Sequence, residues 1–190
     1  DALAGGEAQE VVADYNGNPV LSCWDRIDLG SGVQWAMMSE MDVAEAFSPK
    51  DVEGTYYYAK YIEKYGYYDL FLINPDGFVF YTVTREADYQ TNMVDGKYSS
   101  SNLGALTRKA LDTKQFGFAD FTPYDPSGGK PAAFIAQPVL NSGKVEAIVA
   151  LQLPLKGINA IMTERTGMGE TGESYLIGAN KLMRSDSFLD

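Results

Sequence analysis

The sequence predicts an α+β fold in which helices flank a five-stranded antiparallel sheet. Three observations lead to this fold class. Two apolar, β-rich runs surround an Asn-Pro-Asp-Gly turn at residues 74–77. A helical stretch follows at residues 99–112, and three more β-rich runs with glycine-containing turns follow at 116–125, 131–140 and 144–154. The predicted order is two strands, a helical crossover and three antiparallel strands.

The first two strands are expected to form a hairpin within residues 67–86. Pro75 sets the φ of the turn, and Gly77 tolerates the left-handed conformation that closes it. In the helical stretch that follows, the apolar side chains fall on one face, and Ser100 or Ser101 is placed to cap the first turn. The residues of this face are Leu103, Leu106, Ala110 and Leu111.

A second helix leads into the first strand, within residues 51–66. One side of this helix carries Tyr58, Tyr61, Ile62 and Tyr65. A tyrosine stripe can stack on a ligand, but at helical spacing it more often packs against a sheet. We expect the stripe to be part of the core. A lead-in helix, five strands and a helical crossover are together the elements of a PAS-like module.

A repeat indicates a second module that is divided between the two ends of the chain. Residues 17–42 follow the layout of residues 129–154 at an offset of 112, so residues 9–42 carry the last three strands of a module. The identical residues of this repeat are Gly17 and Gly129, Pro19 and Pro131, and Val33 and Val145. Residues 173–186 follow residues 69–82 at an offset of 104 and carry the first two strands.

The predicted organisation therefore has three parts. Residues 1–47 are the last three strands of one module, residues 48–163 are a complete module with its lead-in helix, and residues 164–190 are a junction followed by the first two strands of a module. A tandem array cut out of phase, a circular permutation, or fragments of two neighbouring domains each account for this order. We favour the out-of-phase cut of a longer tandem chain.

The composition excludes several classes of function. The chain has 190 residues and a formal net charge of −11, so nucleic acid and anionic membrane surfaces are not expected partners. It has no histidine, which removes Ser-His and Cys-His nucleophile pairs and the commonest zinc ligand. The single cysteine, Cys23, lies in an apolar run and is expected to pack rather than to react. We predict no enzymatic activity, no metal site and no cofactor.

Residues 167–172, GMGETG, match the G-x-G-x-x-G fingerprint of dinucleotide-binding proteins. The fingerprint works after a strand and at the start of a helix, whereas this one follows a helical stretch and precedes a predicted strand at 173–177. We expect its glycines to end the helix and turn the chain. The sequence has no run of 18 apolar residues, so a membrane anchor is expected outside these residues.

Four segments carry a family resemblance: YGYYDLFLINPDGFVFYTVTREADYQTN at 65–92, GFADFTPYDPSGGKPAAFIAQPV at 117–139, ALQLPLKGINAIMTERTGMGETGESYLIGANKLMRSDS at 150–187 and DYNGNPVLSCWDRIDLGSGVQWAMMSEMDVAEAF at 14–47. They resemble the double Cache (PDC-type, PAS-like) sensor region of bacterial methyl-accepting chemotaxis receptors and sensor histidine kinases. The most specific part, GMGETGESYLIG followed by LMRSD, is similar to the junction between the membrane-distal and membrane-proximal modules of that family. By this resemblance, residues 48–163 are of the membrane-distal type and the two terminal parts are of the membrane-proximal type.

The resemblance implies an extracytoplasmic small-molecule sensor of a bacterial transmembrane receptor, with a chemoreceptor favoured. Ligand binding in the membrane-distal module would shift a helix and so signal across the membrane. The location implied is the periplasmic part of an inner-membrane protein, and a homodimer is one possible assembly. A dimerisation or spacer module that binds no ligand, or a docking site for a periplasmic solute-binding protein, is the alternative, and a pocket filled by side chains would favour it. A solute-binding protein and a cryptic enzyme rank lower.

The candidate ligand-binding side chains come from the middle module. Arg85 is suited to a carboxylate, whereas Asp120 would favour an amine. Each also has a structural reading, because Arg85 can form a solvated pair with Glu86 and Asp120 can cap a turn. The expected ligand is a carboxylate, an amine or a similar metabolite. The candidate residues are Tyr81, Arg85, Tyr89, Asn92, Asp120, Tyr124, Phe134 and Gln137.

Overall fold

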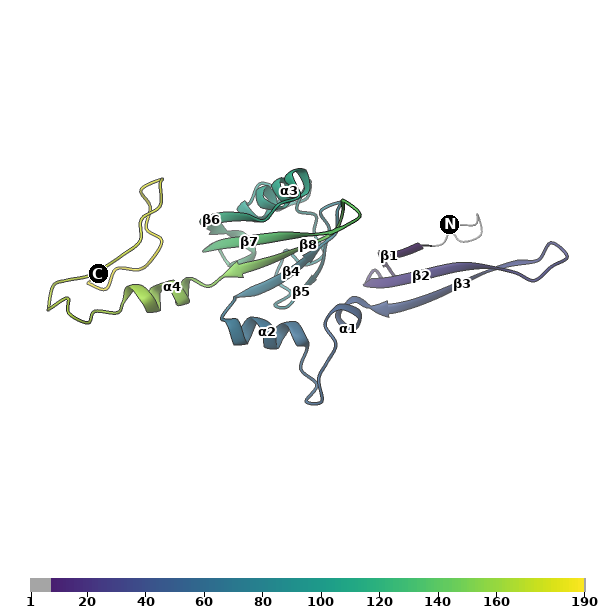
Figure 1. The fold of residues 1–190 in the computed structure, drawn as a ribbon, viewed down its shortest axis with the longest axis horizontal. Helices are drawn as coiled ribbons and strands as arrows, with labels where there is room; N and C mark the ends of the chain where they lie inside the picture. Colours follow the sequence, from purple (N-terminus) through teal and green to yellow (C-terminus); the bar gives the residue numbers. More distant parts are fainter. Residues whose placement is uncertain (1–7, 190) are drawn as a thin grey trace.

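Two antiparallel sheets organise the chain in the computed structural model, which describes residues 8–189 (Figure 1). The first sheet contains, in this order, strands β1 (Ala8–Ala13), β2 (Pro19–Asp28) and β3 (Gln34–Asp42). The second sheet contains β4 (Asp69–Ile73), β5 (Val79–Thr82), β6 (Gly117–Tyr124), β7 (Lys130–Asn141) and β8 (Lys144–Leu153). Its strand order is β5-β4-β8-β7-β6. The predicted α+β class and the five-stranded PAS-like sheet are confirmed.

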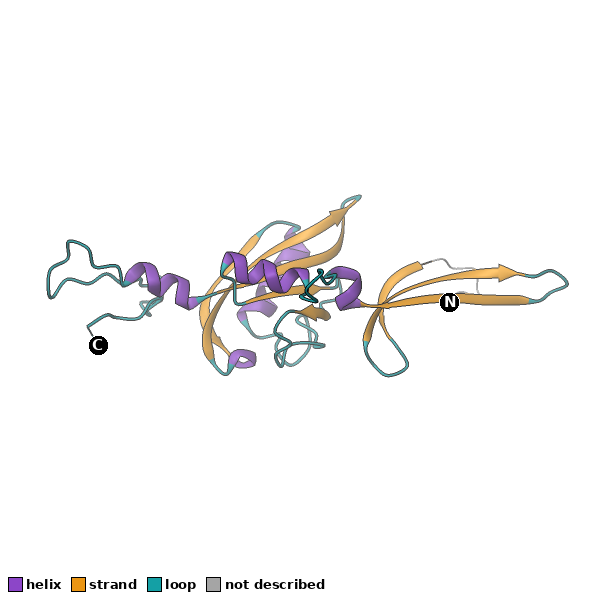
Figure 2. Cartoon of the chain, turned by 90° about the horizontal axis from the view of Figure 1, so that it is seen from below, coloured by secondary structure: helices purple, strands orange, loops and turns teal. Residues whose placement is uncertain are grey.

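Helices lie on both faces of the five-stranded sheet (Figures 1 and 2). One face is covered by α3, and the other is partly covered by α1 and α2. None of the helices within residues 8–189 has the length and the apolar composition needed to cross a membrane. The helices are α1 (Val43–Phe47), α2 (Tyr57–Tyr65), α3 (Asn102–Thr113) and α4 (Leu155–Met162), with a short 3-10 helix, η2, at Asp125–Ser127.

The predicted hairpin and crossover helix form as expected. At the β4–β5 turn, the backbone N–H of Asn74 donates to the carbonyl oxygen of Phe78 over 2.8 Å, and Gly77 has a φ of 95°. A Cβ at Gly77 would lie 2.5 Å from Cγ2 of Val94, so this turn needs glycine for both conformation and space. The first turn of α3 is capped by Ser101, whose Oγ accepts a hydrogen bond from the N–H of Gly104 over 3.1 Å.

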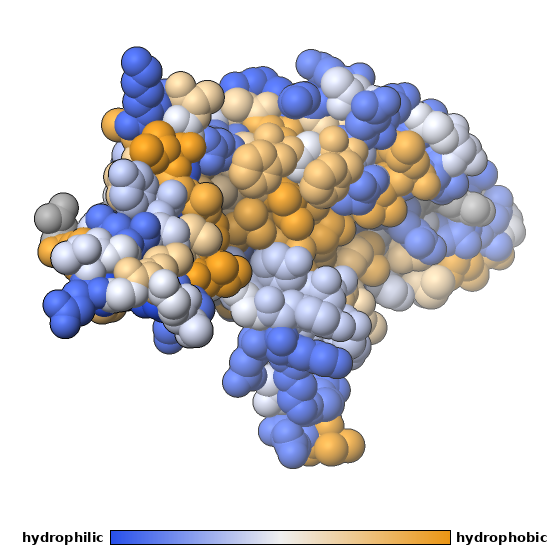
Figure 3. Space-filling model, turned by 60° about the vertical axis from the view of Figure 1, so that its left-hand side comes forward, coloured by the Kyte–Doolittle hydropathy of each residue, from blue (hydrophilic) through white to orange (hydrophobic). Residues whose placement is uncertain are grey.

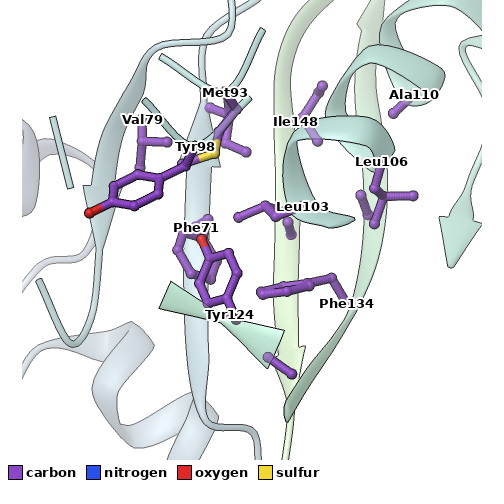
Figure 4. Packing of buried hydrophobic residues seen from close by; sticks show 14 residues of the cluster. Phe71, Val79, Met93, Tyr98, Leu103, Leu106, Ala110, Tyr124, Phe134 and Ile148 are labelled. Carbon is purple, nitrogen blue, oxygen red and sulfur yellow. The ribbon is translucent and has the colours of Figure 1, made fainter. Parts of the chain in front are cut away.

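The larger core lies between α3 and the five-stranded sheet (Figure 4). Phe71 and Phe134 meet edge to face with their ring centres 6.0 Å apart, and the Tyr124 ring lies 4.9 Å from that of Phe134. All three side chains are fully buried. The face of α3 predicted from the sequence supplies Leu103, Leu106 and Ala110 as buried side chains and Leu111 as a partly buried one.

A second core lies on the opposite face, under α1 and α2. The tyrosine stripe of α2 contributes Tyr58 and Tyr61, which are partly buried, together with the buried Ile62. Tyr65, predicted to be in this core, is instead 58% exposed. It is the last residue of α2, and its ring packs against that of Tyr61 rather than against the sheet.

The predicted strand at 173–177 does not form as a strand. Residues 173–186 make a hairpin-like turn with a single β-bridge, between Ile177 and Met183. A strand needs a neighbour along its length, and no strand of either sheet pairs with this segment. The parts of the predicted organisation that fall on residues 1–7 and 190 lie outside the described residues.

Both ends of the described chain expose large apolar side chains. Trp35 and Met38 on β3 are 61% and 59% exposed, and Ile177 and Leu182 near the C-terminus are 57% and 62% exposed. The view of Figure 3, turned toward the C-terminal side, shows a continuous apolar area bordered by polar and charged side chains. Exposed apolar surface of this extent often marks a contact surface.

Replacing Phe134 by alanine should lower the free energy of unfolding by about 3–5 kcal/mol, because the change leaves a cavity between Phe71 and Tyr124. Phe118→Ala is the matched control, since Phe118 lies on the neighbouring strand β6 but is 52% exposed. Urea denaturation of the two variants measures the difference. Equal losses in both would contradict the assignment of Phe134 to the core.

Candidate functional site

The predicted ligand-binding residues do not meet in one cavity. Tyr124 and Phe134 lie inside the α3 core, where their rings fill the space between helix and sheet. Gln137 is exposed on β7, and its side-chain amide donates to the carbonyl oxygen of Pro138. Asn92 holds the start of the crossover, because its side-chain oxygen accepts from the N–H of Val94 over 2.7 Å.

Asp120 is already paired with a cation of the same chain. Its carboxylate accepts hydrogen bonds from Arg184 over 2.9 Å from Nε to each oxygen and over 2.8 Å from Nη2 to Oδ2. The Arg184 guanidinium lowers the pKa of Asp120 by hydrogen bonding. This contact attaches the C-terminal segment to the edge strand β6. The amine-binding role expected for Asp120 would therefore require this ion pair to break.

Tyr81 and Arg85 do share a pocket, of about 180 Å³. Tyr81 is buried on β5 with its ring 5.7 Å from that of Tyr58 on α2, and burial raises the pKa of the Tyr81 hydroxyl. Arg85 is exposed, and its guanidinium lies 5.4 Å from the centre of the Tyr89 ring. The residues that line the pocket are Ala44, Tyr56, Ala59, Tyr81, Thr82, Val83 and Arg85.

Arg85 has an unusual backbone conformation. Its φ is 53°, in the left-handed region, and its N–H donates to Oγ1 of Thr82 over 2.7 Å. The pocket is walled by α1 and by the start of α2 as well as by β5. A molecule bound there would contact both helices and the sheet.

Next to this pocket lies a buried carboxylate that the sequence reading missed. Asp69, the first residue of β4, is fully buried and accepts hydrogen bonds from the N–H groups of Val83 and Thr84 over 2.9 and 3.2 Å. The N–H of Leu70 adds a bond of 2.7 Å, and the hydroxyl of Thr84 adds one of 2.5 Å. Desolvation raises the pKa of Asp69 to about 6, although these hydrogen bonds oppose the shift. An acidic residue directly before four apolar strand residues was the available signal.

A second buried carboxylate, Asp88, belongs to the same end of the sheet. Its Oδ2 accepts a hydrogen bond of 2.7 Å from the hydroxyl of Tyr124, while Oδ1 has no hydrogen-bond partner. Burial raises the pKa values of both groups. Among the residues that the structure describes, no salt bridge reaches Asp69 or Asp88.

Glu86 links this region to the sheet end through hydroxyl groups. It accepts hydrogen bonds from Tyr68 over 2.6 Å and from Ser127 over 2.7 Å, and Ser127 also accepts from the side-chain amide of Gln152. The bond to Glu86 raises the pKa of Tyr68 to about 12. Within residues 8–189, no three His, Cys, Asp or Glu side chains are arranged to hold a metal ion.

A larger groove of about 800 Å³ lies between the two sheets. Its apolar lining includes Leu21 from β2, Phe47 from α1 and Phe80 from β5, and Glu10 and Glu146 lie among the polar residues. The sequence reading did not anticipate this groove, because it depends on how the two sheets pack together.

Comparison with known proteins gives partial structural likenesses. No protein-family model matches the sequence. No curated protein matches it either. Several solved structures resemble the chain in part, and this chain spans less than two thirds of the length of each of those described next.

The ligand-binding domain of the Pseudomonas aeruginosa amino acid chemoreceptor PctB, in complex with L-Gln, is 13% identical, with 86% of this chain and 57% of that chain covered and a TM-score of 0.42. The sensor domain of the V. cholerae histidine kinase DctB is 15% identical, with 56% and 38% covered and a TM-score of 0.39. An extracellular ligand binding receptor from Desulfohalobium retbaense is 12% identical, with 78% and 22% covered and a TM-score of 0.41.

Asp69→Asn should change how stability depends on pH. Because the pKa of Asp69 rises from 3.8 to about 6 on folding, the folded protein binds this proton more tightly than the unfolded chain does. The contribution of Asp69 is therefore most favourable below about pH 4 and is lost as the pH rises through about 6, an effect of about 3 kcal/mol. Asp69→Asn has no ionisable group at this position, so its stability does not fall in this way as the pH rises.

Urea denaturation from acidic to neutral pH measures the effect. The free energy of unfolding of Asp69→Asn should increase relative to that of the wild type as the pH rises. Asp112→Asn, a change of an exposed residue on α3, is the control and should follow the wild type. Parallel curves for wild type and Asp69→Asn would contradict a raised pKa at Asp69.

Proposed function

We propose that this chain is the extracytoplasmic small-molecule sensor region of a bacterial transmembrane signalling receptor, in particular of a chemoreceptor. In this proposal a ligand binds to the complete module at residues 48–163 and moves a helix, and segments outside this chain carry the change across the membrane. The periplasmic location belongs to the same proposal. The proposed function rests on the sequence motifs and on the geometry of the pocket and of the sheet end beside it.

The observation that carries the proposal is the attachment of two helices to one end of the central strand pair. Asp69 of β4 pairs with Gln152 of β8. Helix α2 ends at Tyr65, shortly before β4, and Pro154 alone separates β8 from α4. A displacement at this end of the sheet would therefore shift α2 and α4 relative to each other. Two helices whose relative position changes are what a receptor needs to pass on a bound state.

The pocket at Arg85 is connected to this end of the sheet through the neighbouring residue of the chain. Thr84 precedes Arg85 and donates two hydrogen bonds to Asp69, the first residue of β4. A ligand that draws the Arg85 guanidinium would pull on this connection and press on α2, which forms part of the pocket wall. The ligand must bind one arrangement more tightly than the other, since differential affinity alone shifts a population.

A small carboxylate is the ligand class that fits this pocket. Arg85 supplies a guanidinium next to an aromatic and apolar lining, and a carboxylate pairs with a guanidinium through two hydrogen bonds. The amine alternative relied on Asp120, whose carboxylate is taken by Arg184. A pocket of about 180 Å³ admits a molecule of few atoms unless α2 moves. Tyr81 and Arg85 are the residues we assign to this contact.

A second function is favoured by the filled α3 face. The space between α3 and the sheet, where Tyr124 and Phe134 were expected to line a pocket, is occupied by their own buried rings. A module of this kind that binds no small molecule would serve as a spacer, a dimerisation module or a docking site for a periplasmic solute-binding protein. The ligand experiment separates the two functions.

Thermal unfolding in the presence of acetate, pyruvate, lactate and succinate tests the ligand. A carboxylate present at about 100 times its dissociation constant should stabilise the folded protein by about 2.7 kcal/mol, a midpoint shift of a few degrees. Arg85→Gln should abolish the shift, and Arg26→Gln, which changes an exposed arginine on β2, should keep it. A shift that survives Arg85→Gln would remove this pocket as the site. A cooperative melt that no carboxylate moves would favour the spacer or docking function.

A further inference from the structure

The N-terminal sheet repeats the pairing of the five-stranded sheet residue by residue. In β7 and β8, Phe134 pairs with Gln152, and this register continues to Val139 with Ala147. In β2 and β3, 112 positions earlier, Ser22 pairs with Glu40. The pairs between these two also correspond, and the last pair, Val139 with Ala147, corresponds to Ile27 with Trp35. Strand β3 is therefore the counterpart of β8 in its pairing as well as in its sequence.

The C-terminal turn repeats the β4–β5 hairpin in the same detail. The β4–β5 pair Ile73 and Val79 corresponds, 104 positions later, to the bridge between Ile177 and Met183. The hydrogen bond from the N–H of Gly178 to the carbonyl oxygen of Leu182 is 2.9 Å long, and its counterpart in the β4–β5 turn is 2.8 Å long. Lys181 occupies the position of Gly77 and has a positive φ of 64°. Residues 173–177 are therefore the counterpart of β4.

The contact between these two counterparts is missing. In the complete module β4 pairs with β8, but in the described residues β3 pairs with β2 alone and residues 173–177 pair with no sheet. All nine residues of β3 are exposed. The other outer strand of the N-terminal sheet, β1, corresponds to β6, which is an edge strand in the complete module too. The unmatched edge is thus that of β3.

The two segments lie at opposite ends of the molecule. The five-stranded sheet and its helices stand between the N-terminal sheet and the C-terminal turn in both views (Figures 1 and 2). A strand edge with free N–H and carbonyl groups pairs readily with another chain. A second copy brings the required counterpart strand to this edge without refolding the middle module.

We infer that residues 173–177 of one copy add as an antiparallel strand to β3 of a second copy. Shifting the β4–β8 register by the two offsets pairs Tyr175 with Met38 and Leu176 with Met37. The pair Phe71 and Ala150 is the model for the first, so an aromatic ring again faces an apolar strand. Tyr175 and Leu176 are 46% and 41% exposed, and this addition buries them. The inference is independent of the proposed ligand.

Charge opposes this pairing at one end. The same register places Glu173 opposite Glu40, where like charges directly across a sheet are unfavourable. Glu173 is the first residue of the added strand and Glu40 is exposed on β3, so salt screens the pair, and assembly should strengthen as the ionic strength rises. The contact joins different surfaces of the two copies, so each dimer still has one free β3 and one free C-terminal turn. Assemblies should therefore grow with concentration rather than stop at two copies.

Disulfide trapping between differently tagged copies tests the register. In a Cys23→Ser background, which removes the exposed native thiol, one copy carries Met38→Cys and the other carries Tyr175→Cys. Mild oxidation of the mixture should give several-fold more of the mixed dimer than a mixture with Met41→Cys in place of Met38→Cys. Met41 is exposed on the same strand but lies three positions out of register. Equal yields from the two mixtures would overturn the register.

Three further measurements test the inference, and the first two need no added cysteine. Sedimentation of the unaltered chain over a wide range of concentrations should show association, and a monomer throughout would overturn the inference. Leu176→Lys should weaken the association more than Leu182→Lys, since Leu182 lies on the other strand of the turn. A chain carrying both Met38→Cys and Tyr175→Cys that closes on itself as a monomer would show pairing within one copy and also overturn it.

Discussion

The antiparallel pairing of β4 with β8 is the interaction on which the rest of the structure depends. It joins residues 69–73 to residues 148–152 and thereby connects the β4–β5 hairpin to the sheet of β6, β7 and β8. Along β4, Phe71 and Ile73 point into the α3 core, and Leu70 and Leu72 point into the core under α1 and α2. Both cores therefore rest on one short strand. The pairing closes a long loop, and its entropy cost is met by burial on both faces.

The polar end of this strand pair is difficult to explain by stability alone. Asp69 is buried there with a raised pKa, and Asp88 keeps one buried oxygen without a hydrogen-bond partner. A buried ionised carboxylate costs free energy unless its hydrogen bonds compensate fully. The same end carries α2 and α4. The cost of burying these polar groups therefore falls at the end of the sheet where the two helices attach.

Local signals in the sequence were enough for the elements of the five-stranded sheet and its crossover helix, but not for a strand at 173–177, and the site depended on tertiary packing. The Asn-Pro-Asp-Gly turn, the serine cap of α3 and the alternating strands are set by neighbouring residues, so they could be predicted. Tyr124 and Phe134 were expected to contact a ligand because they lie on strands of the middle module. Which face they fill depends on α3, and the Arg184 partner of Asp120 lies 64 positions away. Asp69 was missed because a buried acid before an apolar run resembles an ordinary strand start.

The repeated segments show which features of a β-hairpin form without a sheet and which features need one. At residues 173–186 the turn survives with nearly the hydrogen bonds of the β4–β5 turn, because turn geometry depends on a few adjacent residues. The strands on either side do not, since a short two-stranded hairpin is marginal without a third strand or a packed face. Strands β2 and β3 are ten and nine residues long and persist as a pair with β1. The missing β4–β8-type contact therefore explains both the unpaired edge of β3 and the unformed strands at the other end of the chain.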